Sequence, residues 1–418
     1  MQIKNLTLGD LGILSDYDPD SMPVEQAREL IKYFLVPLDT QETVPLRAAL
    51  QRTLACDVPS PIAVPPHDYS SMDGYALSHA DLHSAPTKLR LIGKAYAGHP
   101  FADKVATGEC VRIMTGALIP HGCDTVVIQE HVRADNDSIE IGAGHTAGQN
   151  IRRVGEDIAL GTTVLACGQR VRPVEMGLLA SLGLSEVSVY RKLRVAIFSS
   201  GDELQQPGSP LAPGHIYDSN RHTLFGMLSE LGADVLDMGN VGDDKERLKQ
   251  TLLEAAARAD VIITSGGVSV GEADYIRPLL AEIGEIVFWK IAMKPGRPLA
   301  YGKIGASHFF GLPGNPVAVM VTFQQFVRDA LCHLMGQLAT SPIKLSAVCS
   351  EAIKKAPGRT EFQRGILTQG DEGGLIVRTT GAQGSGILSS MSLANCYIVL
   401  PLEQGNVEAG TRVVVQPF

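Results

Sequence analysis

The stretch "DVIITSGGVSVGEADY", residues 260–275, joins a short aliphatic run to two adjacent glycines, two serines and the carboxylates Glu272 and Asp274. The aliphatic run predicts a buried strand that ends just before the glycines. A helical pattern, "DYIRPLLAEIG" at 274–284, follows at once. A buried strand that leads through a polar loop into a helix is the repeating unit of a parallel sheet, so the stretch predicts an α/β domain.

The same alternation continues on both sides of this stretch. Leu224, Met227, Leu228 and Leu231 recur at helical spacing in residues 218–232, and residues 244–260 form a second such pattern that should turn Leu248, Leu252 and Leu253 inward. Residues 193–204 are predicted to form a buried strand that ends in a Ser-Ser-Gly loop. Further strands are predicted at 233–239, 285–293 and 307–312, and a long helix at 316–336 that Pro316 is suited to begin. The series predicts a doubly wound βαβ domain over 191–340, with ligands bound at the carboxyl ends of its strands.

The flanks of this domain have different patterns. Residues 61–161 are rich in short β-type runs separated by glycines, which predicts an inserted β-rich domain. Helical patterns at 23–35 and 172–184 lie on either side of it, so 21–60 plus 162–190 is expected to be a helical linking domain. Residues 341–418 hold strand candidates such as 396–401 and 411–418 and predict a small C-terminal β domain. The fold class is therefore α/β multidomain.

Composition excludes several classes of protein. The chain has 418 residues with 44% hydrophobic and 19% charged, values that are typical of a globular protein. A net charge of −9 disfavours nucleic acid as a partner. The lack of a long apolar run and of a leader-like N-terminus predicts a cytoplasmic protein without a membrane partner. The seven cysteines form no C-x-x-C pair, so each is expected to be a small buried hydrophobe rather than a zinc ligand.

Two motifs of the α/β domain could hold anions or a metal. In residues 264–275, Gly266 and Gly267 allow close approach of backbone N–H groups to an anion, while Glu272 and Asp274 could hold a hard cation. The alternative is a glycine-rich turn followed by an N-cap aspartate. In "FWKIAMKPGRP", 288–298, two lysines four residues apart would share one face of a strand beside Arg297 and could bind an oxyanion. The alternative is a solvated strand edge guarded by lysines.

Two further sets of loops carry polar residues beside glycines. In "GLPGNPVAVMVTF", 311–323, the prolines fix a tight loop, Asn315 could cap the helix, and an anion could bind at the helix start. The alternative is a rigid strand-to-helix connection. The stretches 65–77, 112–120 and 152–161 carry Asp68, Asp73, Thr115, Glu156 and Asp157, which could be site residues or only turn formers. The sequence lacks a dinucleotide fingerprint and a P-loop, which disfavours hydride transfer and ordinary nucleotide hydrolysis.

Seven motifs, taken in order, resemble the molybdopterin molybdenumtransferase family, which includes the C-terminal domain of gephyrin. They are "SSMDGYA", "RIMTGA", "GEDI", "SSGDEL", "TSGGVSVGEADY", "KPGRPLAYG" and "GLPGNPVAVMVTF". The resemblance runs from about Pro23 to the C-terminus. Val268 and Ser269 follow the glycine pair where the related adenylyltransferases usually carry Thr-Gly, which favours the branch that inserts the metal.

The resemblance implies an enzyme that takes adenylyl-molybdopterin and molybdate as substrates, leaves molybdenum on the dithiolene and releases AMP, with Mg²⁺ required. It implies an elongated homodimer of four-domain subunits, a small-molecule pterin substrate and handover from a molybdopterin adenylyltransferase. Two rival functions remain, a non-catalytic gephyrin-like scaffold and the adenylyltransferase reaction itself.

The resemblance also implies site residues, transferred motif by motif. The expected catalytic residues are Asp73, Thr115, Asp157, Glu203, Asp243, Asp274, Lys290 and Lys294. The expected substrate-binding residues are Ser265, Gly266, Gly267, Pro313, Gly314, Asn315, Pro316, Arg364 and Ser385. Glu203 and Asp274 are the expected Mg²⁺ ligands, the two lysines are expected to bind anionic groups, and the two prolines are expected to shape the molybdate pocket.

Overall fold

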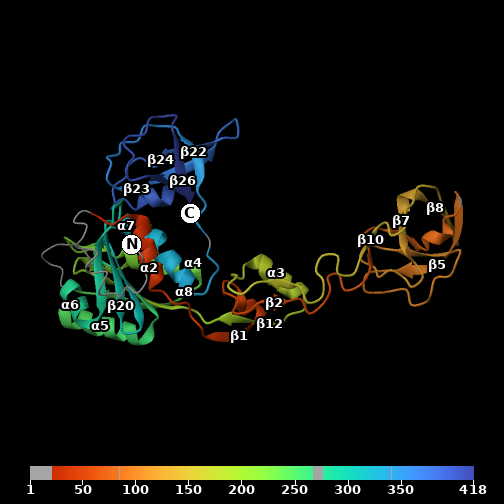
Figure 1. The fold of residues 1–418 in the computed structure, drawn as a ribbon, viewed down its shortest axis with the longest axis horizontal. Helices are drawn as coiled ribbons and strands as arrows, with labels where there is room; N and C mark the ends of the chain where they lie inside the picture. Colours follow the sequence, from red (N-terminus) through yellow and green to blue (C-terminus); the bar gives the residue numbers. More distant parts are fainter. Residues whose placement is uncertain (1–20, 84, 267–275, 340) are drawn as a thin grey trace.

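The computed structural model describes residues 21–83, 85–266, 276–339 and 341–418. The molecule is elongated (Figure 1): the α/β sheet and the C-terminal β domain lie together at one end, a linking section follows, and the β-rich domain lies at the far end. In the described part of the chain, no helix is long and apolar enough to cross a membrane.

The α/β domain is built on a six-stranded sheet, as the strand and helix pattern predicts. The strand order is β16 (Asp234–Val241), β13 (Arg194–Ser200), β17 (Val261–Ser265), β21 (Ser307–Leu312), β20 (Pro298–Ile304) and β18 (Glu285–Lys290). The first four strands pair in parallel, and β20 pairs antiparallel with both of its neighbours. The carboxyl ends of the four parallel strands therefore lie along one edge of the sheet.

Helices cover both faces of this sheet. One core contains residues of α4 (Ser219–Leu231) and of the continuous helical segment α7 (Pro316–Thr322), η4 (Phe323–Val327) and α8 (Arg328–Leu334). The opposite core contains residues of α5 (Lys245–Arg258) and α6 (Ile276–Ile283). The inward position expected for Leu253 is wrong, because that residue is 47% exposed. Leu248 and Leu252 are buried four residues apart on one face, and the next residue turns away from it.

The predicted strand 285–293 is shorter than expected, and β20 was not predicted. β18 ends at Lys290, and β19 (Met293–Lys294) pairs instead with β23 of the C-terminal domain. The sequence of β20 has no clear strand pattern because it begins with a proline and contains Gly302. A Cβ at Gly302 would lie 2.0 Å from the carbonyl oxygen of Glu285, so this glycine permits β18 to approach.

The C-terminal domain is a small closed barrel. Its strands are β22 (Leu345–Cys349), β23 (Thr360–Gln369), β24 (Leu375–Thr379), β25 (Cys396–Leu400) and β26 (Arg412–Pro417), and the short helix α9 is Ser389–Leu393. The ring closes because β23 pairs with both β24 and β25. Phe362, Met391 and Tyr397 of this domain are buried in the same core as the α/β helices, so the two domains pack together.

The β-rich domain has a six-stranded sheet in the order β7–β4–β6–β5–β9–β8. Its strands are β4 (Gly74–Leu77), β5 (Thr87–Ala95), β6 (Glu109–Ile113), β7 (Thr125–Ile128), β8 (Val132–Asp135) and β9 (Ser138–Ile141). β3 (Tyr69–Ser70) precedes this sheet in the sequence and β10 (Ile151–Arg152) follows it, and the two pair antiparallel.

The linking section contains more strand than the helical domain that was expected. The predicted helix 172–184 is present as α3 (Pro173–Ser181), beside two two-stranded sheets. These are β1 (Gln41–Pro45) with β12 (Glu186–Tyr190), and β2 (Val58–Pro59) with β11 (Thr163–Leu165). The other predicted helix, α2 (Val24–Tyr33), packs in the α/β core. An apolar stripe predicts that a helix is buried, but it does not say against which core.

The cysteines are less uniform than expected. Cys110, Cys349 and Cys396 are buried, whereas Cys56 is exposed and the remaining three are half-buried. All seven are free thiols.

Candidate functional site at the sheet edge

Three loops meet at the carboxyl ends of β13, β17 and β21. The N–H of Gly266 donates to the carbonyl of Leu312 at 3.1 Å. Gly266 has a φ of +93°, and a Cβ there would lie 2.8 Å from the carbonyl oxygen of Ser200. The close approach therefore requires glycine, and it brings Gly266 and Ser265 beside the loop that carries Pro313 and Gly314.

Asn220, in the first turn of α4, ties two of these loops together. Its amide nitrogen donates to Ser265 Oγ at 2.8 Å and to the carbonyl of Gly314 at 2.7 Å. Its Oδ1 is buried and has no partner among the described residues. Asn220 is not among the residues predicted from the sequence, although it is an asparagine two residues after Asp218, the N-cap of α4.

A buried charge network fixes the start of α4. Asp218 caps the helix by accepting from the N–H of Arg221 at 3.2 Å, and the Arg221 guanidinium bridges Asp218 at 3.0 Å and Asp237 at 2.6 Å. The hydroxyl of Ser199 also donates to Asp218. Burial lowers the pKa of Arg221, but the hydrogen bond and charge of Asp218, together with Asp237, outweigh it and raise the pKa above its usual value. The network holds Asn220 in place.

The C-terminal barrel meets the start of α7 at the same edge. Pro316 is the first residue of α7, as expected, and the N–H of Val317 donates to the carbonyl of Ser385 at 3.0 Å. Ser385 therefore contributes its backbone at this point. The expected cap by Asn315 is wrong, because its side chain makes no capping hydrogen bond. Its carbonyl instead accepts from Val319 at 3.0 Å.

Arg364 of β23 is a buried cation beside this contact. It is 1% exposed, its Nε donates to Ser390 Oγ at 3.0 Å, and its Nη2 donates to the carbonyl of Gly384 at 3.0 Å. Burial lowers the pKa of this guanidinium, with partial opposition from Tyr397. All of its hydrogen-bond partners among the described residues are neutral oxygens. None of these partners is a carboxylate that could neutralise its charge. A buried, uncompensated guanidinium is suited to binding an anion.

The two lysines belong to different sheets. Lys290 is exposed at the end of β18, whereas Lys294 lies on β19 beside the barrel. The expectation that they share one face of one strand is wrong, because the strand ends between them. Lys294 Nζ lies 3.4 Å from Glu361 Oε1, and this carboxylate is 5% exposed and also accepts from Gln363 at 2.8 Å.

Carboxylates cluster at the ends of β13 and β16. Glu203 and Asp243 are exposed in the loops that follow these strands. The loops are joined because Asp202 Oδ1 accepts from the N–H of Asp243 at 3.0 Å and Asn240 donates to the carbonyl of Gly201 at 3.3 Å. Within the described residues, no group of three or more histidines, cysteines and carboxylates is arranged to hold a metal. Gly267 and Asp274 lie outside the described residues.

Asp73 and Thr115 border strands β4 and β6 of the β-rich domain, which lies at the far end of the molecule (Figure 1), and Asp157 lies between β10 and β11. Asp73 Oδ1 accepts from both the N–H and the hydroxyl of Thr115 at 2.8 Å, and these bonds lower the pKa of Asp73. Asp157 is exposed on a separate turn, where its N–H donates to the carbonyl of Val64 at 3.0 Å. Within one chain these three residues are not brought to the sheet edge.

Family models match three successive parts of the chain. Residues 22–183 match the MoeA N-terminal region (domain I and II), 196–333 match a probable molybdopterin binding domain, and 346–418 match the MoeA C-terminal region (domain IV). The fold and the sheet-edge site thus define a protein of the molybdopterin-binding α/β class with MoeA-type flanking domains.

Comparison with whole relatives identifies the family. The chain is 44% identical to the molybdopterin molybdenumtransferase of Haemophilus influenzae over 95% of this chain and 98% of that protein. It is 34% identical to gephyrin of Dictyostelium discoideum, over 94% of this chain and 61% of gephyrin. A crystal structure of the molybdopterin biosynthesis MoeA protein of Pyrococcus horikoshii OT3 superposes with a TM-score of 0.83, at 30% identity, over 96% of this chain and 100% of that one. The chain belongs to the molybdopterin molybdenumtransferase family.

Proposed function

We propose that the protein transfers molybdenum from molybdate to adenylyl-molybdopterin, with release of AMP. The observation that carries the proposal is the sheet edge itself, where the three strand-end loops meet a buried guanidinium whose described partners are all neutral. Two anions, molybdate and a nucleotide-linked pterin, need such a combination of backbone donors and cations.

The residues around Arg364 are suited to molybdate. The Arg364 guanidinium supplies the charge, and Ser385 lies between it and the first turn of α7. Pro313 and Pro316 fix the loop that shapes this pocket, and Gly314 and Asn315 lie between them. Because Asn315 makes no capping bond, its side-chain amide can contribute to binding.

The remaining loops are suited to the adenylylated pterin. β17 ends at Ser265, and Gly266 and Gly267 come next in the sequence; glycines at this point allow a pyrophosphate to come close to the backbone. Lys290 and Lys294 supply positive charge for its anionic groups, and an anion at Lys294 would compete with Glu361 for the ammonium.

Mg²⁺ is part of the proposal. Glu203, Asp274 and Asp243 are its proposed ligands, since an all-oxygen donor set is the one that this hard cation prefers. When bound, Mg²⁺ neutralises charge that develops on the pyrophosphate, which makes AMP a better leaving group. The protein itself positions the two anions.

The active enzyme is a homodimer in this proposal. Asp73, Thr115 and Asp157 lie far from the sheet edge of their own chain (Figure 1), so they would complete the site of the other subunit. The proposal also includes a cytoplasmic location and direct receipt of the pterin from a molybdopterin adenylyltransferase.

AMP release tests the reaction. Purified protein is incubated with adenylyl-molybdopterin, with and without molybdate and Mg²⁺, and separately with ATP and molybdopterin. The proposal expects AMP only when both molybdate and Mg²⁺ are present. Adenylylation of molybdopterin from ATP would identify the adenylyltransferase reaction instead, and no turnover in either assay would favour a scaffold role.

Subunit exchange tests the shared site. Asp73→Ala and Asp274→Ala are expected to inactivate the enzyme separately, and the two variants are then mixed under conditions that allow exchange. Half of the dimers become mixed, and each mixed dimer holds one intact site, so about a quarter of wild-type activity should return. If activity stays absent while mass spectrometry confirms exchange, the site is built within one chain.

A further inference from the structure

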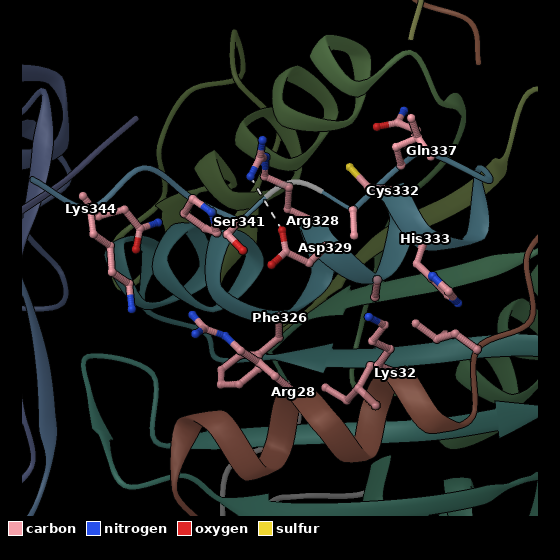
Figure 2. Close-up of a pocket in the computed structure, with 17 residues that line it drawn as sticks. Arg28, Lys32, Phe326, Arg328, Asp329, Cys332, His333, Gln337, Ser341 and Lys344 are labelled. Carbon is pink, nitrogen blue, oxygen red and sulfur yellow. Dashed lines mark ion pairs between the residues drawn. The ribbon is translucent and has the colours of Figure 1, made fainter. Parts of the chain in front are cut away.

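A cavity of about 480 Å³ lies beside Arg28, Phe326 and His333 (Figure 2). α2 forms one wall and η4 with α8 forms another. The connection to the C-terminal barrel closes it through residues such as Leu338 and Lys344, and Gln416 of β26 adds a residue from the barrel. The occupant of this cavity would therefore contact both the α/β domain and the barrel.

The helical segment that begins at Pro316 separates this cavity from the sheet edge. The lining residues Phe326 to His333 lie roughly 15–25 Å along that segment from its start, at about 1.5 Å per residue. The cavity is thus distinct from the loops that carry the proposed transferase function.

The cavity gathers positive charge in a chain whose net charge is −9. Four permanent cations line it, whereas Asp329 is the one carboxylate among the described lining residues. The cations are Arg28, Lys32, Arg328 and Lys344. Asp329 lies 3.6 Å from Arg328, and burial raises its pKa. Arg28 also lies 3.7 Å from Glu25, one turn away on α2. Two carboxylates cannot balance four cations, so the lining retains a net positive charge.

Apolar side chains form the rest of the wall. They include Ile31 and Leu35 of α2, Phe326 of η4, Ala330 of α8 and Leu338 of the connection. A simple inorganic anion would leave this surface in contact with water, and an uncharged hydrophobe would leave the excess positive charge of the lining unneutralised. The wall is thus suited to a ligand that has both an anionic group and an apolar part.

We propose that this cavity binds a phosphate monoester attached to an aromatic or apolar body. The dianionic phosphate matches the excess of cations better than a single carboxylate would, because arginine and lysine both bind phosphate well. The volume lies in the range of small-molecule sites, about 300–1,000 Å³. Because the cavity is walled by both domains, its occupant also holds the barrel, which carries Arg364 and Ser385, against the α/β domain.

1-Naphthyl phosphate is the probe for this site, with 1-naphthol and inorganic phosphate as comparisons. Isothermal titration of the full chain should show tighter binding of the ester than of either comparison compound. Equal affinity for 1-naphthol would show that the cations are not used, and equal affinity for inorganic phosphate would show that the apolar wall is not used; either result overturns the proposal.

Variants locate the bound probe. Lys32→Gln combined with Lys344→Gln should raise its dissociation constant at least about tenfold, the effect of losing one or more charge-assisted hydrogen bonds. Ala339→Trp, in the connection, should block binding while leaving every lining charge in place. Lys88→Gln, an exposed lysine of the β-rich domain, is the matched control and should bind normally.

Lys294→Gln separates this proposal from the transferase function. Unchanged probe binding in that variant places the ligand outside the sheet edge and supports the cavity, whatever the AMP assay shows. Loss of binding in Lys294→Gln, or normal binding in both the double lysine variant and Ala339→Trp, would overturn the proposal.

Discussion

Replacing Arg364 with methionine should separate stability from anion binding. The guanidinium is 1% exposed and its partners in the described chain are the hydroxyl of Ser390 and backbone carbonyls. Removing this charge abolishes a desolvation cost of several kcal/mol. It also removes two well-formed charged hydrogen bonds, worth about 1.5–3 kcal/mol each. These opposing effects nearly cancel, and methionine fills similar apolar space.

We therefore expect the free energy of unfolding to change by less than about 2 kcal/mol in Arg364→Met. The loss of one charge-assisted contact to molybdate costs about 1.5–3 kcal/mol, so the dissociation constant of molybdate should rise roughly 10-fold to 150-fold. Equilibrium dialysis with molybdate gives the affinity, and urea unfolding followed by circular dichroism gives the stability.

Arg378→Met is the matched control. Arg378 is exposed on β24 and pairs with Ile366 of β23, so it lies in the same barrel but outside the buried contact. The Arg378→Met variant should bind molybdate as the wild type does. If Arg364→Met binds molybdate normally and loses several kcal/mol of stability, the guanidinium is structural and the reasoning fails.

Three further predictions concern the α/β domain. Leu252→Ala should lower the free energy of unfolding by about 2–5 kcal/mol and the exposed Leu253→Ala by less than about 0.5 kcal/mol; equal effects in urea unfolding would contradict the assignment of the buried face. Burial and nearby Lys303 lower the pKa of His308 from 6.5 to about 4, so the folded state holds the ring neutral while the unfolded state binds a proton. Stability should be complete above pH 6.5 and fall toward pH 4, and His308→Gln should reduce this pH dependence. Asn220→Ala should raise the KM for molybdate or pterin while the chain stays folded, because it frees the loops of Ser265 and Gly314; unchanged kinetics would show that other contacts hold these loops.

Periodicity predicted the local elements of the α/β domain well. The alternation of aliphatic runs and helical stripes gave β13, α4, β16, α5 and β17 in order, because local spacing reports which face of an element is buried. The same reasoning extended β18 past Lys290 and missed β20. After Lys290 the chain leaves the sheet of the α/β domain and pairs with the barrel. In β20, Gly302, which permits β18 to approach, weakens the local strand pattern.

The candidate site was only partly accessible to sequence reasoning. Motif wording selected Ser265, Gly266 and the 313–316 loop, and the structure places these together at one edge of the sheet. Asn220 was missed because an asparagine near a helix start is usually a local cap, and only the tertiary fold aims it at two other loops. The assignment of Lys290 and Lys294 to one face failed for the related reason that strand register depends on distant partners.

The barrel adds to the sheet edge a buried guanidinium that has no acidic partner in the described chain. The strand-end loops supply carboxylates and backbone donors, whereas the buried cation comes from β23, and the contact between Val317 and Ser385 places it beside the first turn of α7. A guanidinium with no acidic partner in the described chain is costly to bury in a domain that has no anion to bind. Because Arg364 lies in the barrel and the proposed cavity spans the same two domains, we expect the position of the barrel relative to the sheet to set how strongly an anion is held.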